Sequence, residues 1–452
     1  MTEALATAIE PEAAVDLRRL STRDAQRLLE IVLVLARHGA FVVVRRGPYL
    51  VLRLRRRGPR ALAVAVRRSF TDLGPTFVKL GQLIASSPGL FPPTLSQEFR
   101  RLLDQLPAEP APAVRALIER ELGAPIATLF GSFDDRPVAA ASIAQVHRAT
   151  LPDGSPVAVK VRRPRLARRI ERDLRLLRLL AALLQHAGTA GDVANPAAIV
   201  DDFATTLRSE LDFRNEAAAM IDFAALLARH DDANVTVPLP VDGMVSPRVL
   251  VMTFVDGTPV DDVDELRAQG QDLEQILRTA VQSWVRGALA DGLFHGDVHA
   301  GNLFVLHGGQ VAFLDWGIVG RLDEGMRAAL VELIAAVLLE HDFAHAARIV
   351  FELGVATKPV QDLDRVARDF QALVEPLLST RLADISYGEV LAQVIPLAGR
   401  YAVRLPRELV LVVKQLVYFE RYAKQLAPNY QILADPGILS GVLATLYVNH
   451  QQ

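Results

Sequence analysis

The chain has 452 residues, of which 51% are hydrophobic and 23% charged, and its formal net charge is -2. A chain of this length can bury a large core and favours two or three folding units over one. The absence of cysteine excludes disulfides, thiolate metal ligands and a thiol nucleophile, so any chemistry depends on carboxylates, lysine, histidine or a bound metal.

No apolar stretch reaches the roughly 18 residues that a membrane-spanning helix needs, although the mean hydropathy is +0.22. Residues Met1–Leu17 include acidic side chains and lack the charged start and apolar stretch of a secretory signal. We therefore expect a cytoplasmic protein. Any contact with a membrane is expected to be peripheral, at the inner face of the cell membrane.

Residues 1–22 are predicted to form a loose tail, and residues 23–125 a helical extension. Apolar residues recur at helical spacing through the extension, and this pattern breaks at Gly47-Pro48, Gly58-Pro59, Gly74-Pro75 and Pro88–Pro93.

Arginines crowd one part of the extension with no acidic residue between them. They are Arg45, Arg46, Arg53, Arg55, Arg56, Arg57, Arg60, Arg67 and Arg68. Apolar residues alternate with these arginines, as expected of a surface that meets anionic lipid headgroups. A solvated, arginine-rich helix face is the simpler interpretation and is favoured over lipid binding. Nucleic-acid binding is the least favoured.

Residues 126–255 have a mixed pattern, in which short runs of β type alternate with helical patterns. The expected strands are Phe130–Val138, Gln145–Ala149, Pro156–Val161, Val235–Pro238 and Arg248–Phe254, and the expected helices are Arg165–His186 and Pro196–His230. Residues 256–452 are mostly helical, with short strands at Leu303–Leu306 and Val311–Leu314. This layout predicts an α+β, bilobal, protein-kinase-like fold, with a small five-stranded N-lobe and a helical C-lobe.

The C-lobe carries two short polar motifs flanked by apolar residues, His-Gly-Asp-Val-His-Ala-Gly-Asn at 295–302 and Leu-Asp-Trp-Gly at 314–317. In a kinase-like site the first Asp receives the proton of the substrate hydroxyl, and the Asn and the later Asp hold the metal ions that bridge the nucleotide phosphates. Asp297, Asn302 and Asp315 occupy these three positions.

These two motifs also resemble those of small-molecule phosphotransferases such as aminoglycoside and choline kinases, and the C-lobe alone does not separate the classes. Gly296 replaces the arginine of H-R-D, so no cation is available there to engage a phosphorylated activation loop. Regulation through such a loop is not expected. We expect His295 to pack against the D-W-G segment and His299 to be structural.

A lysine that could face the nucleotide phosphates ends the run Val157-Ala158-Val159-Lys160. Such a lysine needs a carboxylate on the following helix to hold it over the phosphates. Glu210, Asp212 and Glu216 are the acidic residues available there, and the spacing does not settle which of them pairs with Lys160.

A kinase would carry a glycine-rich loop just before the strand hairpin, and this chain has an alanine-rich one instead. The segment reads Ala139, Ala140, Ala141, Ser142, Ile143, Ala144, Gln145, Val146. Ala139, Ala141 and Ala144 fall on the glycine positions and Val146 on the valine position. Each alanine adds a Cβ and disfavours positive φ, so we expect nucleotide to bind in an altered geometry.

Within the extension, Lys79 and Gln82 lie on one face of a predicted helix in the sequence Lys-Leu-Gly-Gln. Together with Ala-Ala-Ala-Ser-Ile-Ala-Gln-Val-His, Val-Ala-Val-Lys-Val, Glu-Leu-Asp-Phe-Arg-Asn-Glu-Ala and the two C-lobe motifs, this helix resembles the UbiB family of atypical kinases. The resemblance covers roughly residues 65–425, and the combination of motifs is very specific.

The resemblance implies that the K-x-G-Q helix folds across the nucleotide site, where a peptide substrate would otherwise lie. Lys79 and Gln82 would then enter the active site, with Lys79 near Glu210 and Asp212. It also implies that Lys160 pairs with Glu216 or Glu210, and that Met252 is the gatekeeper.

Two departures from the family pattern stand out. Thr253 follows the gatekeeper where many relatives carry an acidic residue, and Pro436–Gln452 is too short and polar for the membrane-spanning helices with which some relatives end.

The family resemblance implies an ATP- and Mg²⁺-dependent atypical kinase or ATPase that supports the biosynthesis of ubiquinone or another isoprenoid quinone lipid. Its expected partners are that lipid or its biosynthetic enzymes, with peripheral contact to an anionic membrane and no nucleic acid. The alternatives are a small-molecule phosphotransferase and a catalytically silent ATP-binding scaffold. The phosphoryl acceptor and the oligomeric state stay open.

Overall fold

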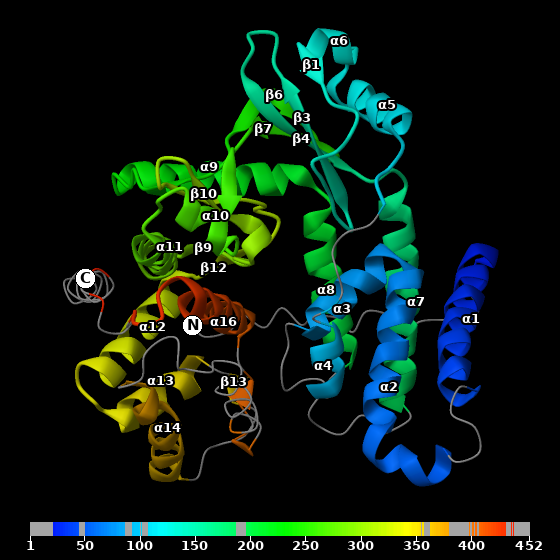
Figure 1. Ribbon diagram of the computed structural model, residues 1–452. Coiled ribbons are helices and arrows are strands. Elements are labelled where there is room, and N and C mark those ends of the chain that lie inside the picture. Colours follow the sequence, from blue (N-terminus) through cyan, green and yellow to red (C-terminus); the bar gives the residue numbers. More distant parts are fainter. Residues whose placement is uncertain are drawn as a thin grey trace, which may run out of the picture. The chain divides into compact units, whose positions relative to one another are not determined.

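The computed structural model of the chain describes residues 21–44, 50–85, 93–99, 101, 107–186, 196–353, 355–356, 362–378, 397, 400–401, 403–404, 406–430, 435 and 437. The chain divides into two compact units (Figure 1). The first comprises Met1–Asp104 and Arg165–Arg208, and the second comprises Gln105–Pro164 and Ser209–Gln452.

The first unit is helical. Its helices are α1 (Thr22–Val44), α2 (Leu50–Leu73), α3 (Pro75–Ala85), α4 (Pro93–Phe99), α7 (Leu166–His186) and α8 (Pro196–Glu210), the last of which ends just inside the second unit. A buried ion pair joins α1 to α7, because Arg27 Nε donates to Asp173 at 2.7 Å. Segments far apart in sequence therefore share one helical core.

Two of the predicted helix breaks fall on described backbone, and they have different outcomes. Gly74 adopts φ +90°, which favours glycine, and α3 begins at Pro75, so this break is confirmed. The break at Gly58-Pro59 is wrong, because α2 continues through it. A proline removes one helical hydrogen bond and favours a kink, but it does not by itself end a helix. Gly47-Pro48 and most of Pro88–Pro93 lie outside the described residues.

The second unit contains an antiparallel sheet of the strand order β1-β3-β4-β7-β6, with β2 paired to β3. The strands are β1 (Ser132–Phe133), β2 (Ala139–Ala140), β3 (Ala144–Thr150), β4 (Pro156–Arg162), β6 (Pro240–Val245) and β7 (Val249–Thr253). Alternate residues of β4 face opposite sides. Val157, Val159 and Val161 pack with helix α5 (Ala111–Leu122), whereas Ala158 belongs to the main core of the unit.

The sheet corrects three details of the predicted N-lobe. Val235–Pro238 contains strand β5 (Val235–Thr236), but β5 pairs with β11 (Val311–Phe313) in a different sheet. The strand β6 was missed because its Asp242-Gly243 step has the composition of a turn. The predicted strand Phe130–Val138 is β1 and an irregular segment that leads to β2.

Helices and short strands complete the second unit. The helices are α6 (Ile126–Leu129), α9 (Phe213–Arg229), α10 (Val263–Ala268), α11 (Leu273–Arg286), α12 (Glu324–Leu338), α13 (Phe343–Leu353), α14 (Leu363–Leu378) and α16 (Arg407–Leu426). The other strands are β8 (Gly257–Pro259), β9 (Leu293–His295), β10 (Leu303–Leu306), β12 (Val319–Arg321), β13 (Val355–Ala356) and β14 (Val403–Arg404). The predicted strands at Leu303–Leu306 and Val311–Leu314 are thus confirmed as β10 and β11.

The core of this unit is aromatic. Trp284 and Trp316, the two tryptophans of the chain, are both buried and belong to one apolar cluster with Phe223, Phe294 and Phe419. Trp316 contacts Phe223 with ring centroids 4.4 Å apart, and Trp284 contacts Phe419 at 5.7 Å. Trp284 also contacts Phe294 on β9, with ring centroids 5.2 Å apart. Within the described part of the chain, no helix combines the length and apolarity needed to cross a membrane.

Candidate active site

One face of the N-lobe sheet carries residues that the sequence assigns to nucleotide binding. Val146 pairs with Lys160 across β3 and β4, and Ala158 pairs with Met252 across β4 and β7. Paired residues share a face of an antiparallel sheet, so these four side chains lie on the same side. Val146, Ala158 and Met252 pack with the C-lobe core, which places Lys160 beside an apolar wall.

Lys160 is the centre of a buried charge cluster. Its Nζ lies 2.7 Å and 2.9 Å from the two carboxylate oxygens of Glu216 on α9, and 2.9 Å from Oδ1 of Asp315. Lys160 is 8% exposed and Glu216 is 4% exposed. Among the three acidic candidates, Glu216 is therefore the one in contact with Lys160.

The two buried partners respond differently to their surroundings. Burial disfavours the charge of Lys160, but Asp315 and Glu216 more than offset it and raise the pKa of the ammonium group. Burial also raises the pKa of Glu216 to about 7, against the opposing effect of the Lys160 charge. Lys160 is therefore cationic at neutral pH, whereas Glu216 titrates close to neutrality.

The other two acidic candidates have different positions. Asp212 caps the N-terminus of α9, where its carboxylate accepts hydrogen bonds from the backbone and side chain of Arg214. Arg214 holds the pKa of Asp212 below its usual value. Glu210 ends α8, and its charge contributes to the raised pKa of Glu216. The helix predicted over Pro196–His230 is interrupted between these two acids.

His295 connects the two C-lobe motifs. Its Nε2 lies 2.8 Å from the carbonyl oxygen of Leu314, and its Nδ1 lies 3.1 Å from the backbone N–H of Asp297. A carbonyl can only accept and an N–H can only donate, so the imidazole is the neutral tautomer with its proton on Nε2. Burial lowers its pKa and favours the same state. His295 also packs against Trp316, which confirms its expected role beside the D-W-G segment.

Asp297 and Asn302 are held within one tight loop. The side-chain amide of Asn302 donates to the carbonyl oxygen of Asp297 at 3.0 Å. His299 accepts from the backbone N–H of Gly301 and lies 3.6 Å from Oδ2 of Asp297. The histidine thus stabilises the loop that carries both predicted site residues.

Asp315 adopts φ +53°, a conformation that residues other than glycine rarely take. Such strain persists only when surrounding contacts impose it, and it is common at functional sites. Lys160 contacts Oδ1 of Asp315, and the indole of Trp316 donates to the carbonyl oxygen of Phe313. The side chain of Asp315 is half exposed, in contrast to Lys160.

The structure explains why glycine stands at position 296. The backbone N–H of Gly296 donates to the carbonyl oxygen of Ile318 at 2.9 Å. A Cβ at this position would lie 2.8 Å from Cγ2 of Ile318, which is closer than real Cβ contacts allow. The close pairing of β9 and β12 leaves no room for an arginine.

The alanine-rich segment is a short hairpin between β2 and β3. Ala139 pairs with Val146 and Ala140 with Gln145, and the N–H of Ala141 donates to the carbonyl oxygen of Ala144. The two residues at the tip, Ser142 and Ile143, are buried. Arg163 holds this tip, since it donates to the carbonyl oxygens of Ala141 and Pro107.

The remaining predicted site residues are placed as follows. Lys79 and Gln82 lie on α3, in the first unit, and both are half-buried. Lys160, Asp297 and Asp315 belong to the second unit. The entry of Lys79 and Gln82 into the nucleotide site stays a prediction. Thr253 forms a pair of hydrogen bonds with the backbone of Leu239.

Comparisons with known proteins agree with this geometry. Residues 101–350 match the ABC1 atypical kinase-like domain, and residues 370–431 match the UbiB helical domain. The chain is 32% identical to the probable protein kinase UbiB of Tolumonas auensis. The 424 aligned residues cover 91% of this chain and 77% of the relative. This chain belongs to the UbiB family of atypical kinase-like proteins.

Two mycobacterial proteins are also similar to this UbiB-family chain. An uncharacterized protein of Mycobacterium tuberculosis strain H37Rv is 42% identical over 409 residues, which are 90% of this chain and 83% of that protein. The solved complex of Rv3197 with erythromycin, from the same species, superimposes with a TM-score of 0.50 at 25% identity, covering 79% of this chain and 92% of the other. The α+β, bilobal kinase-like fold is confirmed.

The UbiB helical segment contributes contacts that sequence reasoning missed. Lys414 on α16 places its Nζ 2.8 Å from Oδ1 of Asp297, and the next residue, Gln415, bonds the backbone on both sides of Asp297. These residues lie more than a hundred positions beyond the loop at residues 295–302, the predicted catalytic loop, and form no short motif with it. No signal in the sequence alone could have found them.

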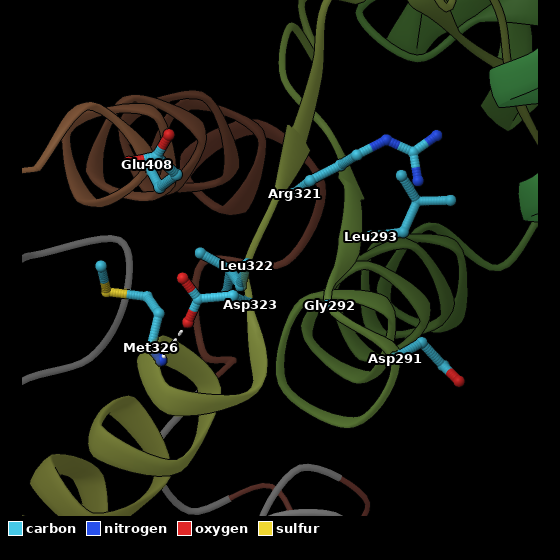
Figure 2. A pocket seen from close by; sticks show the side chains of 8 residues that line it. All are labelled: Asp291, Gly292, Leu293, Arg321, Leu322, Asp323, Met326 and Glu408. Carbon is cyan, nitrogen blue, oxygen red and sulfur yellow. Dashed lines mark hydrogen bonds between the residues drawn. The ribbon is translucent and has the colours of Figure 1, made fainter. Parts of the chain in front are cut away.

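A hollow of about 480 Å³ lies at the other end of the β9 and β12 pair (Figure 2). Leu293 and Arg321 line it and pair with each other, whereas His295 pairs with Val319 at the end that leads to Asp297. None of the predicted site residues lines this hollow, which is bounded by Asp291, Gly292, Leu293, Arg321, Leu322, Asp323, Met326 and Glu408. We assign it no chemistry.

Proposed function

We propose that this UbiB-family chain is an ATP- and Mg²⁺-dependent atypical kinase or ATPase. The contact of Lys160 with both Glu216 and Asp315 is the observation that carries the proposal. In kinases the lysine–glutamate pair and the metal-binding aspartate must both be in place for phosphoryl transfer. A scaffold that only binds nucleotide has no need of a candidate base and of two metal-ligand positions in the same site.

The residues available fit Mg²⁺. Because the amide nitrogen of Asn302 donates to the backbone of Asp297, its carbonyl oxygen is the end that can coordinate a hard cation. Asp315 adds a half-exposed carboxylate. Among the described residues, no group of three or more His, Cys, Asp or Glu could hold a metal by itself. Mg²⁺ at nucleotide sites uses one or two carboxylates, with phosphates and waters as the other ligands.

The residues divide the chemistry between them. Lys160 would position the α and β phosphates, held in place by Glu216. Asn302 and Asp315 would hold Mg²⁺, which supplies charge neutralisation for the phosphates. Asp297 would accept the proton of the attacking hydroxyl or water. At the same time the oxygen of that hydroxyl or water would bond to the γ-phosphorus, and the bond between this phosphorus and the ADP leaving group would break.

We further propose that this activity supports isoprenoid quinone lipid metabolism from a peripheral position on an anionic membrane, on the cytoplasmic side. Membership of the UbiB family supports the lipid role. Exposed Leu29, Val32 and Leu33, at helical spacing on α1, support membrane contact. The arginine run adds to this, although its side chains through position 59 lie outside the described residues.

Hydrolysis of Mg-ATP by the purified full-length chain tests the catalytic proposal. We expect turnover that falls by about 100-fold or more in Asp315→Asn and Asp297→Asn. Equal turnover in both variants and the parent would show that the site is wrongly assigned. Nucleotide binding without Asp315-dependent turnover would instead favour the scaffold.

Liposome flotation tests the membrane proposal. The parent protein should float with vesicles that contain an anionic lipid. Reversal of Arg55, Arg56 and Arg57 to Glu should reduce the fraction of protein that floats. Reversal of the exposed Arg120, Arg136 and Arg267, in the second unit, is the matched control. Unchanged flotation after reversal of the three arginines would contradict a role for the run.

A further inference from the structure

A cation from the C-terminal part of the chain contacts the candidate base. The Nζ of Lys414 lies 2.8 Å from Oδ1 of Asp297, and the two residues are 117 positions apart in sequence. Lys414 lies on α16, within the segment that matches the UbiB helical domain and outside the kinase-like match. Its side chain is 16% exposed, so this is not an ordinary solvated surface lysine.

Neighbouring contacts fix α16 against the catalytic loop. The side chain of Gln415 accepts from the N–H of Val298 at 2.9 Å and donates to the carbonyl oxygen of Gly296 at 2.7 Å. The hydroxyl of Tyr422 donates to the carbonyl oxygen of Val298 at 2.7 Å. Both residues that flank Asp297 are therefore bonded to the helix that carries Lys414, and these bonds hold that part of α16 against the loop.

The catalytic loop has no room for a cation at the arginine position of H-R-D. Gly296 occupies this position, and a Cβ there would collide with Ile318. His299 is the basic residue that the loop itself offers near Asp297, at 3.6 Å, and it is more exposed than Lys414. A carboxylate that must accept a proton in one orientation benefits from a fixed, charge-assisted hydrogen bond on one oxygen.

We propose that Lys414 is a positioning residue for Asp297, so that the UbiB helical segment completes the active site of the kinase-like domain. The ammonium group engages Oδ1 and directs proton acceptance to Oδ2. This inference rests on the proposed ATP turnover and adds a residue to it from outside the kinase-like segment.

The test compares full-length variants in Mg-ATP hydrolysis, with separate determination of kcat and KM. Lys414→Met should lower kcat by about 10- to 100-fold and leave KM within about twofold, because Asp297 is not among the residues proposed to hold the nucleotide. Lys414→Arg, which keeps a cation, should retain more of the activity. Lys424→Met is the matched control, since Lys424 lies ten positions further along α16 and pairs with Glu420.

Two further readouts separate positioning from packing. Added methylammonium should restore part of the turnover of Lys414→Ala and none of that of Asp297→Asn. Because Lys414 acts through Asp297, the double variant Lys414→Met/Asp297→Asn should be no slower than Asp297→Asn alone, within about twofold.

The outcomes are distinct. If Asp315 is needed for turnover but Lys414→Met keeps the parent kcat, the inference is overturned and the proposed function stands. A loss that accompanies a lower unfolding midpoint, with no rescue by the amine, assigns Lys414 to packing and also overturns it. Absence of Asp315-dependent turnover in the parent removes the proposed function and this inference together.

Discussion

Two lysine–carboxylate pairs in the second unit differ in their burial and in how far the sequence alone predicts them. Lys160 lies within a strand, is almost fully buried and contacts both Glu216 and Asp315. Lys414 lies on a helix, is partly exposed and contacts Asp297. In the first pair, a local motif places Lys160 in its strand, and the sequence narrows its partner to three acids. The second depends entirely on how α16 packs against the catalytic loop.

The comparison also separates two energetic regimes. Removal of one partner from a buried ion pair costs about 3–5 kcal/mol, because an uncompensated charge is left in a medium of low dielectric. A partly exposed pair costs less, because water can replace the missing partner. Replacement of Lys414 can therefore lower activity more than it lowers the free energy of unfolding. Replacement of Lys160 should lower both strongly.

The largest effect is expected from Lys160→Met. This change removes the cation from Glu216 and Asp315, so we expect a loss of nucleotide affinity and turnover of about 100-fold or more, together with a lower free energy of unfolding. Titration with a fluorescent ATP analogue and denaturant unfolding measure the two quantities. Glu216→Gln is the comparison variant, because it removes the negative charge of the partner and keeps the size of the side chain. Parent-like affinity in Lys160→Met would contradict the phosphate-positioning role.

A smaller effect on stability is expected from Gly296→Ala. The new Cβ would meet Ile318, and overpacking of this kind costs about 1–3 kcal/mol. The loop that carries Asp297 should shift with it, so kcat should fall as well. The double variant Gly296→Ala/Ile318→Ala removes the atom that lies 2.8 Å away and should recover part of the loss. A wild-type unfolding midpoint for Gly296→Ala would show that steric exclusion is not the reason for this glycine.

Nucleotide affinity should depend on pH through Glu216, because burial raises the pKa of this carboxyl group to about 7. Below that pH the carboxyl group is neutral and holds Lys160 less firmly, so affinity should fall several-fold, by roughly threefold to tenfold, between about pH 8 and about pH 6. Glu216→Gln should lack this component. Protonation of the nucleotide itself is common to both proteins, so the difference between their two profiles isolates Glu216. Parallel profiles would contradict the assignment.

The smallest effect is expected from Lys424→Met. Lys424 forms an i,i+4 pair with Glu420 and is nearly half exposed. Such pairs contribute about 0.3–0.5 kcal/mol, so the unfolding midpoint and kcat should both stay near the parent values. A large loss of kcat here would mean that α16 is sensitive to charge along its whole length, and the specific contact of Lys414 would lose its significance.

The sequence by itself determined those features whose residues are close together in the chain. The two C-lobe motifs, the strand that ends near Lys160, and the strands β10 and β11 could all be predicted, because hydrophobic periodicity and motif spacing act over a few residues. The sequence also narrowed the partner of Lys160 to a few acids on one stretch of helix. The break at Leu211-Asp212, which separates Glu210 from Glu216, was not visible in the apolar pattern.

Tertiary structure decided what depends on distant packing. It chose Glu216 as the partner of Lys160, moved β5 into a second sheet, and joined α7 to the N-terminal helices through Arg27 and Asp173. It also brought Lys414 and Gln415 to the catalytic loop across more than a hundred residues. Contacts of this kind follow from the shape of the whole core, because the burial of Phe419, Trp284 and Tyr422 sets where α16 lies, and no local pattern encodes that position.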